Sequence, residues 1–378
     1  MFPTSLYIHV PWCIRKCPYC DFNSHKSPDN LPEQAYINAL LDDLRQDLSY
    51  LPQRPISSIF IGGGTPSLLS AKAYVHLLAE LQKLVTFLPD IEITMEANPG
   101  TIEHDRFEEY RQAGINRLSL GIQSFNPVHL KTLGRIHDDT QAHRAIDTAR
   151  RAGFDNINID IMQSLPNQTV AEGLSDLNAA LSHQPEHLSW YQLTIEPNTV
   201  FYKQRPQLPS EEVNAELEQE GFALLNKSGF KRYEISAFCQ AGRESYHNIN
   251  YWLFGDYYGI GAGAHGKITL EAPQTIYRTR KQRQPSDYLN SDKAYLAGKE
   301  VIDSKALIFE FMLNTTRLQQ QIPHHLFQER TGLPQVAIQP YLEQATQKGL
   351  LRLNEHFWQV TEHGRLFTND LQELFLPD

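Results

Sequence analysis

The chain has 378 residues, which is enough for two or three domains of roughly 100–200 residues each. Its composition, 41% hydrophobic and 21% charged, is that of an ordinary globular protein, and its formal net charge of −10 argues against nucleic acid or an anionic membrane as a general partner. No apolar run approaches the ~20 residues of a membrane helix. The N-terminal residues lack the pattern of a secretory signal, and the four cysteines do not form a disulfide framework. We therefore expect a cytoplasmic protein with reduced thiols.

Strands and helices are predicted to alternate over the first part of the chain. Strand-like runs span 5–10, 56–61, 91–97, 117–121, 156–161 and 187–193. Helical signals follow each run, at about 33–50, from Ser70, around 102–112, from a Thr140 cap to before Gly153, from a Thr169–Glu172 capping box, and at 210–227. Six strand–helix units in succession predict a parallel sheet with right-handed crossovers. Because eight units close a TIM barrel, we predict an α/β fold with a partial, open-sided (β/α)6 TIM-like barrel over residues 1–236, with its chemistry at the carboxyl ends of the strands.

The alternation stops near residue 237. Residues 237–300 are expected to be connecting loops, with aromatic residues at 247–252 and a glycine-rich stretch at 257–266. Within them, 272–292 is typical of a linker or surface loop. Residues 301–378 predict a smaller α+β winged-helix-like domain, with helices near 304–313, 323–331 and 335–348, a hairpin of 350–353 with 357–360, and a final helix. This domain has no basic helix for nucleic acid, so a docking or lid role is favoured.

Three of the four cysteines, Cys13, Cys17 and Cys20, lie in one short segment with the spacing Cys-x3-Cys-x2-Cys. Such a loop can supply three thiolates to an iron–sulfur cubane and leave one iron without a protein ligand. An open position on a metal site is where a substrate or cofactor binds. The alternative is a structural zinc site completed by His25 or Cys239, although zinc sites more often use paired Cys-x2-4-Cys knuckles.

The cysteine spacing, together with the predicted half-barrel, resembles the radical S-adenosylmethionine (SAM) superfamily. The resemblance implies a [4Fe-4S] cluster whose fourth iron is chelated by the amino and carboxylate groups of SAM. It also implies that an electron from the cluster can cleave the sulfonium to a 5′-deoxyadenosyl radical. By the same resemblance, the glycine run after the second strand meets the SAM amino group, and Tyr19 contacts adenine through its backbone. Glu96, Gln123 and Asp160 fall at or near strand ends, where carboxylates suit a sulfonium cation and a ribose.

A narrower set of motifs is similar, in order and spacing, to the oxygen-independent coproporphyrinogen III oxidase family. The similarity includes the segments 7–13 (YIHVPWC) and 63–66 (GGTP), the single residues Glu96, Gln123, Arg135 and Asp160, and the C-terminal unit. The resemblance implies that SAM is contacted by Tyr7, Gly63, Gly64, Thr65, Glu96, Gln123, Arg135 and Asp160.

The chain departs from the oxidases in two places. They carry a further cysteine two residues after the third, where this chain has Phe22, and a long segment ahead of the cysteines, where this chain has twelve residues. Both differences resemble the HemW-type branch of the family, whose members are regarded as heme chaperones. The segment His247-Asn248-x-x-Tyr251-Trp252 is similar to a motif of that branch.

Two interpretations of this motif remain open. His247 is a possible heme ligand through its imidazole, with Tyr251 and Trp252 stacking on the macrocycle. Alternatively, the motif packs the end of the barrel and His247 bonds a backbone carbonyl. The basic residues Arg278, Arg280, Lys281 and Arg283 suit heme propionates, but a solvated loop is the favoured interpretation.

The resulting hypothesis is a heme chaperone that binds a [4Fe-4S] cluster, SAM and heme, and that transfers heme to an acceptor protein. The alternative is a radical enzyme that oxidatively decarboxylates coproporphyrinogen III, and a DNA-binding regulator is a third, disfavoured by the acidic charge. Whether SAM is cleaved stays open, so no catalytic residue is assigned. A membrane-associated acceptor and a homodimer also stay open, and nucleic acid is not expected as a partner.

Overall fold

A twelve-stranded sheet organises the molecule, a computed structural model that describes residues 4–100, 106–271 and 274–377. Its order is β14-β13-β12-β11-β1-β4-β5-β6-β7-β8-β10-β9. The six predicted strands are its central part, and each pairs in parallel with the next. They are β1 (Thr4–Val10), β4 (Ile56–Gly63), β5 (Phe87–Ala97), β6 (Arg117–Gln123), β7 (Ile157–Gln163) and β8 (His187–Gln192). The predicted fold class is confirmed.

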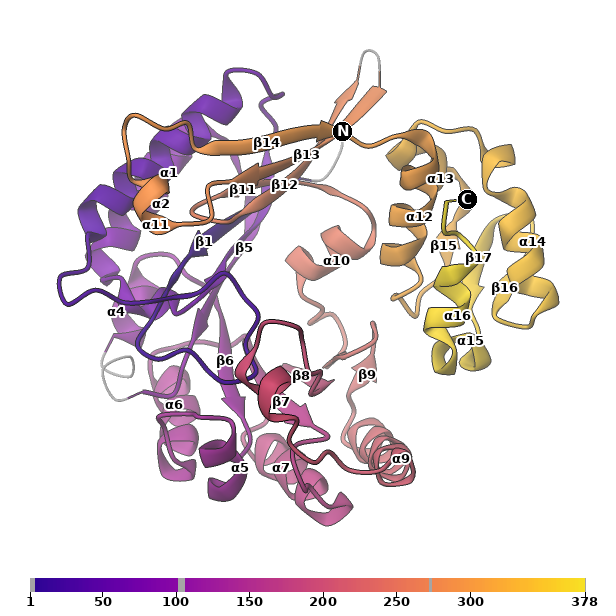
Figure 1. Cartoon of the computed structure of the whole chain (residues 1–378), viewed down its shortest axis with the longest axis horizontal. Coiled ribbons are helices and arrows are strands. Elements are labelled where there is room, and N and C mark those ends of the chain that lie inside the picture. The colour runs from indigo at the N-terminus through magenta and orange to yellow at the C-terminus, as the bar shows by residue number, and fades with distance from the viewer. Residues whose placement is uncertain (1–3, 101–105, 272–273, 378) are drawn as a thin grey trace.

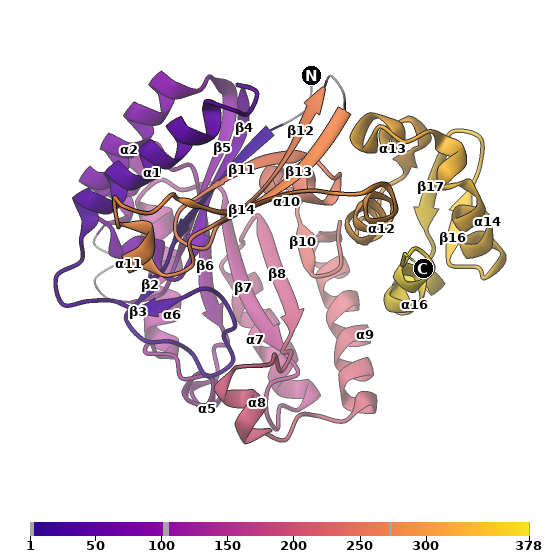
Figure 2. The same ribbon diagram turned by 45° about the horizontal axis from the view of Figure 1, so that its top comes forward.

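Helices cover the outer face of the curved sheet, as Figures 1 and 2 show. Alternate residues of each strand explain this layering: Leu6 and Ile8 of β1 are fully buried in the core beneath the helices, whereas Ser5 bonds Ser58 of β4 on the inner face. The outer helices are α1 (Glu33–Leu48), α2 (Ala71–Leu84), α4 (Phe107–Gln112), α6 (Asp139–Arg151), α7 (Val170–Ser182) and α9 (Glu211–Lys227).

Most predicted helix boundaries agree with the structure. The Thr169–Glu172 capping box is present, but α6 begins one residue before Thr140, and its cap is the Asp138 side chain in a capping box with Gln141. Part of the helix expected around 102–112 lies outside the described residues. Two short helices that the periodicity did not indicate are α5 (Pro127–Thr132) and α8 (Val200–Gln204).

The expectation of loops between 237 and 300 is wrong. This segment forms β10 (Ala237–Cys239), α10 (Tyr246–Trp252), β11 (Asp256–Ile260), β12 (His265–Glu271), β13 (Gln274–Lys281), α11 (Pro285–Tyr288) and β14 (Leu296–Val301). Strand β11 pairs in parallel with β1 and so extends the barrel sheet on its other side. Strand β11 has only five residues and runs into a glycine-rich stretch, so its period of two does not stand out from the sequence. The short β9 (Lys231–Arg232) ends the sheet beyond β10.

The basic residues 278–283 are also not a solvated loop. Arg278 pairs with Glu310, and the fully buried Lys281 pairs with Asp43 at 2.5 Å and with Asp47 at 2.7 Å. Burial of so many charges is tolerated because each has a partner of opposite sign. Arg280 also pairs with Glu300 at 3.1 Å, at the surface, so three of the four cations already have acidic partners within the fold.

The C-terminal part has a hydrophobic core separate from the main barrel core; it includes Phe311, Leu342 and Trp358 and is joined by Phe254 and Ile276 of the preceding region. Figure 1 shows it on the open side of the barrel. Its helices are α12 (Ser304–Thr315), α13 (His324–Thr331), α14 (Gln339–Gln347), α15 (Glu362–Leu366) and α16 (Thr368–Glu373). The predicted hairpin is β16 (Leu351–Leu353) with β17 (Phe357–Val360), joined by the edge strand β15 (Ile322–Pro323).

Candidate functional site

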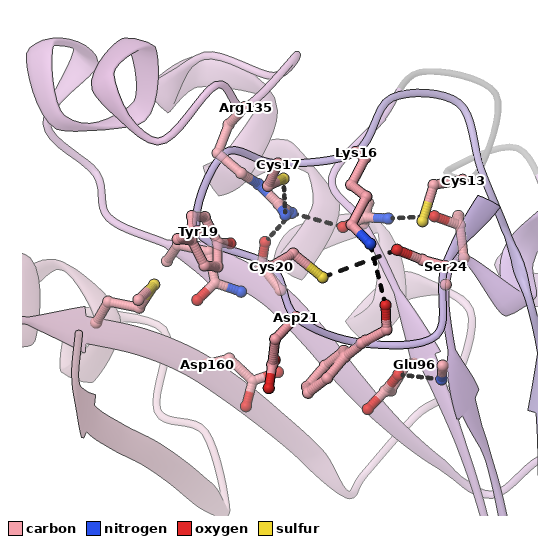
Figure 3. Close-up of a pocket in the computed structure, with 18 of the residues that line it drawn as sticks. Cys13, Lys16, Cys17, Tyr19, Cys20, Asp21, Ser24, Glu96, Arg135 and Asp160 are labelled. Atoms are coloured by element: carbon pink, nitrogen blue, oxygen red, sulfur yellow. Dashed lines mark hydrogen bonds between the residues drawn. The ribbon is translucent and has the colours of Figure 1, made fainter. Parts of the chain in front are cut away.

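A cavity of about 390 Å³ lies at the carboxyl ends of the barrel strands. The three clustered cysteines line one side of it, and Glu96 and Asp160 rise from the strands on the other side (Figure 3). The cysteine loop leaves β1 through a short pairing of β2 (Trp12–Cys13) with β3 (His25–Lys26). The other predicted SAM-contacting or adenine-contacting residues that line the cavity are Tyr19, Gly63, Gly64, Thr65, Gln123 and Arg135.

The sulfur atoms lie among groups that suit thiolates. Burial raises the pKa of Cys13 and of Cys20, while hydrogen bonds from Thr65 to Cys13 and from Ser24 to Cys20 act in the opposite direction. A guanidinium nitrogen of Arg135 lies 3.7 Å from Cys17 Sγ. A cation and hydroxyl donors stabilise sulfur in its anionic form, which is the form that binds iron.

The two carboxyl groups face the cavity from strands that are separated only by β6. The pKa of Glu96 is raised to about 8 by burial first and then by the charge of Asp160. Burial also raises the pKa of Asp160, although Asn158 at 2.8 Å and Ser119 at 3.0 Å donate hydrogen bonds to it. A cation bound between these two carboxyls would stabilise their ionised forms, so the pair suits a positively charged ligand.

Arg135 holds the cysteine loop to the barrel. One of its terminal nitrogens donates to Asn98 Oδ1 at 2.5 Å and to the Gly121 carbonyl at 2.6 Å, while the other lies beside Cys17. Gln123 has a left-handed backbone, with φ of 70°, and its side-chain oxygen accepts a bond of 2.6 Å from the Tyr191 hydroxyl. A strained residue at a strand end is typical of functional sites.

The glycine run is required by the packing of the protein itself. A Cβ on Gly64 would lie 2.5 Å from the carbonyl oxygen of Trp12, and Gly63 combines φ of +115° with contact to the His9 ring. The Gly63 amide donates to Glu96 at 3.0 Å. Glycine is needed because the strand end and the base of the cysteine loop approach so closely.

Tyr7 and His247 are placed away from the cavity wall. Tyr7 is not among the lining residues; its hydroxyl bonds His9 Nδ1 at 2.8 Å and its ring stacks on Phe60. His247 is 1% exposed, packs 5.0 Å from Phe60 and lies 3.3 Å from the Ser58 hydroxyl. Burial lowers its pKa to about 3.

The motif that contains His247 therefore forms a helix, α10, against the inner face of the sheet. The backbone amide of His247 donates a hydrogen bond to Glu92. The ring lies beside the Ser58 hydroxyl and not against a backbone carbonyl, and its Nε2 has no hydrogen-bond partner among the described residues. Tyr251 and Trp252 follow His247 by four and five residues, and they line a second cavity of about 220 Å³ with Arg278. The predicted role of His247 in heme ligation stays a prediction.

The alternative zinc ligands lie elsewhere. His25 is on β3 and does not line the cavity, and its Nε2 lies 3.3 Å from Asn23. Cys239 is buried on β10, where it pairs with His187 at the amino end of β8, the edge of the sheet opposite the cysteine loop. Cys239 is therefore not positioned to complete a zinc site with the three clustered cysteines, and the His25 ring is already engaged with Asn23.

Sequence reasoning missed several residues that complete the cavity. Asn98 holds Arg135, Tyr191 holds Gln123, and Ser119 supports Asp160. Ser119 and Tyr191 alternate with buried apolar residues on their strands, so the period of two places them on the inner face. That alternation was the available signal, although it does not distinguish a site residue from other inner-face positions.

Comparison with known proteins agrees with this geometry. The model of the radical SAM superfamily matches residues 7–177, and that of the HemN C-terminal domain matches residues 302–367. Heme chaperone HemW of Haemophilus influenzae is 47% identical over 100% of this chain and 98% of its own length. HemW of Escherichia coli is 46% identical over 100% and 99%. The chain belongs to the HemW family.

This chain shares its fold with an oxidase of the family to which the motifs pointed. The solved structure of coproporphyrinogen III oxidase (HemN) from Escherichia coli superimposes with a TM-score of 0.81, covers 99% of this chain and 90% of its own, and is 24% identical. At that identity the likeness concerns the fold alone. The predicted membership in the radical SAM superfamily and its HemW-type branch is confirmed.

Membership in the radical SAM superfamily implies a [4Fe-4S] cluster and SAM, and the cavity suits both groups. The three cysteines offer thiolates to the cluster, and the carboxyls of Glu96 and Asp160 offer a counter-charge for the cationic cofactor. None of the described helices is both long and apolar enough to cross a membrane.

Proposed function

We propose that this chain is a heme chaperone, which binds heme and transfers it to an acceptor protein, and that it carries a [4Fe-4S] cluster and SAM. The observation that carries the proposal is the 46–47% identity, over essentially whole chains, to two proteins named heme chaperone HemW. We place the activity in the cytoplasm. Two further points stay open in this proposal. Heme-transfer assays test whether the acceptor is membrane-associated, and sedimentation tests whether the chain forms a homodimer.

In this proposal the cluster and SAM share the cavity at the carboxyl ends of the strands. Cys13, Cys17 and Cys20 hold the cluster, which supplies one-electron chemistry when bound. Glu96 and Asp160 balance the positive charge of SAM, and the backbone of Tyr19 borders adenine. The other proposed SAM contacts are Tyr7, Gly63, Gly64, Thr65, Gln123 and Arg135; Tyr7 would act from behind the cavity wall.

We further propose that the chain does not decarboxylate coproporphyrinogen III. Phe22 lines the cavity and is 59% exposed at the position where the oxidases carry an additional cysteine. An exposed aromatic ring offers no sulfur to a cluster or a radical. The residue that distinguishes the two functions therefore lies within the cavity.

One reconstituted sample tests both functions. Titration with hemin is expected to produce a Soret shift, and mixing with an apo-acceptor is expected to move the heme to the acceptor. With dithionite, SAM and coproporphyrinogen III, we expect no protoporphyrinogen over many turnovers. Absence of heme binding would reject the chaperone, whereas sustained protoporphyrinogen formation would establish the oxidase.

A further inference from the structure

A cleft of about 580 Å³ lies between the barrel and the C-terminal part. It shares no lining residue with the cysteine cavity. It is bordered by α9 and β9 on one side and by α12, α15 and α16 on the other, and both views show α9 beside this end of the C-terminal part (Figures 1 and 2). Its volume falls within the roughly 300–1,000 Å³ of small-molecule sites. Trp252 and Asn314 line both this cleft and the smaller cavity beside α10.

Three arginines line the cleft: Arg232, Arg317 and Arg365. Arg317 lies over the Trp252 ring at 4.3 Å and pairs with Glu234 at 3.1 Å, so its position is fixed. The buried Nε atoms of Arg317 and Arg365 and the buried indole nitrogen of Trp252 have no hydrogen-bond acceptor among the described residues. Buried donors without acceptors cost free energy, and a ligand with acceptor oxygens would remove that cost.

Apolar side chains occupy the other part of the lining. Leu366 is 78% exposed, Phe367 45% and Leu313 39%, and all three border the cleft. Phe222 adds an aromatic ring, over which Arg232 lies at 4.6 Å. Large apolar residues that gather around one concave site mark a surface for an apolar ligand.

We propose that this cleft binds a planar, largely apolar macrocycle that carries two carboxylates. The carboxylates would bind Arg317 and Arg365, and the ring would lie against Leu366, Phe367 and Trp252. Under the proposed function, on which this inference rests, the ligand is heme. Guanidinium groups bind carboxylates through paired, charge-assisted hydrogen bonds. Glu218 and Asp370 also line the cleft, and Glu234 pairs with Arg317, so the charges nearly balance and recognition rests on the arginine donors that lack acceptors.

The lining also determines what the cleft would recognise. None of its residues is His, Cys, Met or Tyr, so the cleft offers no common axial ligand for iron. It would therefore select the carboxylates and the macrocycle, and protoporphyrin IX without iron would bind about as well as hemin. His247 lies outside the cleft and would not be the ligand in this bound state.

The test compares variants of the full-length reconstituted protein in fluorescence-quenching titrations with hemin, protoporphyrin IX and protoporphyrin IX dimethyl ester. Arg365→Glu is the main variant, and Leu366→Glu, at an exposed position, tests the apolar wall. Arg352→Glu, exposed on β16 of the same domain, is the matched control. Circular dichroism and the cluster absorbance check that each variant is folded and loaded.

We expect Arg365→Glu and Leu366→Glu each to weaken hemin and protoporphyrin IX binding by about tenfold or more, because a lost charged contact or apolar contact is worth on the order of one decade in affinity. Arg352→Glu should bind as the wild type does, and the dimethyl ester should bind weakly to every variant. Wild-type affinity in Arg365→Glu, or tight binding of the ester, would overturn the site while leaving the chaperone proposal intact. A wild-type protein that binds no porphyrin would reject both.

Discussion

Glu96 and Asp160 face one cavity from β5 and β7, and the charge of Asp160 adds to burial in raising the pKa of Glu96 to about 8. Ser119, on the strand between them, donates a hydrogen bond to Asp160. This bond lowers the pKa of Asp160 and so favours its ionisation over that of Glu96. The arrangement keeps one carboxyl protonated near neutral pH until a cation enters. It links the chemistry of the site to measurable dependence on pH.

The free energy of unfolding of the cluster-free protein should depend on pH through Glu96. Because its pKa rises on folding from the ordinary 4.5 to about 8, the folded state holds the extra proton between these values. The contribution is therefore complete below about pH 4.5 and is lost as the pH rises through about 8. Glu96→Gln should show a shallower loss of stability from pH 5 to pH 9 in urea unfolding. Glu216→Gln, at an exposed position on α9, should follow the wild type; an unchanged slope in Glu96→Gln would contradict the prediction.

Binding of SAM to the reconstituted protein should show the opposite trend. A cation favours the ionised form of Glu96, so proton release accompanies binding and affinity should increase as the pH rises from about 6 to about 8. Glu96→Gln should bind more weakly and lose this increase. Isothermal titration in buffers of different ionisation enthalpy measures the released proton directly, and a binding enthalpy independent of the buffer would refute it.

Each of the three clustered cysteines should be necessary for the cluster. Replacing Cys13, Cys17 or Cys20 by serine removes one of three thiolates from the cavity and should abolish iron binding. Cys239→Ser, on the opposite edge of the sheet, should retain the full iron content. Iron and sulfide analysis with the visible absorption spectrum decides the matter, and loss of iron in Cys239→Ser would show that the ligands are misassigned.

The left-handed backbone at Gln123 should be visible in stability measurements. Both Gln123→Gly and Gln123→Ala lose the bond to Tyr191, but only glycine adopts φ of 70° without strain. Gln123→Gly should therefore be more stable than Gln123→Ala by about 1 kcal/mol. Urea unfolding compares the pair, and equal stability would mean that the backbone relaxes at this position.

The buried Lys281 should be essential to the stability of the barrel. Lys281→Met leaves Asp43 and Asp47 facing each other without a cation and should lower the free energy of unfolding by about 3–5 kcal/mol. The exposed Arg283→Met, two residues away, should have little effect. A small effect of Lys281→Met would mean that the two carboxyls share a proton, which the pH dependence of unfolding would reveal.

The cluster loop and the barrel core could be predicted because their signals are local. The cysteine motif lies within eight residues of chain. Each of the six strands is an apolar run followed by a helical pattern, which can be recognised in the sequence. Glu96 and Asp160 could be placed in one site because parallel strands bring their carboxyl ends to one edge. The family resemblance supplied the remaining cavity residues and the HemW-type branch.

Tertiary structure alone decided the region from 237 to 300. Strand β11 is only five residues long and adjoins a glycine-rich stretch, and its pairing with β1 depends on contacts between residues about 250 positions apart. Lys281 lies 238 residues from Asp43 and 234 from Asp47. The sequence therefore shows only a basic segment, and the ion pairs that bury it appear only in the fold. The sequence by itself thus determined the cofactor loop and the order of the barrel. Only the fold decided which charges are buried, where α10 lies, and that a cleft lined by arginines forms between two parts of the chain.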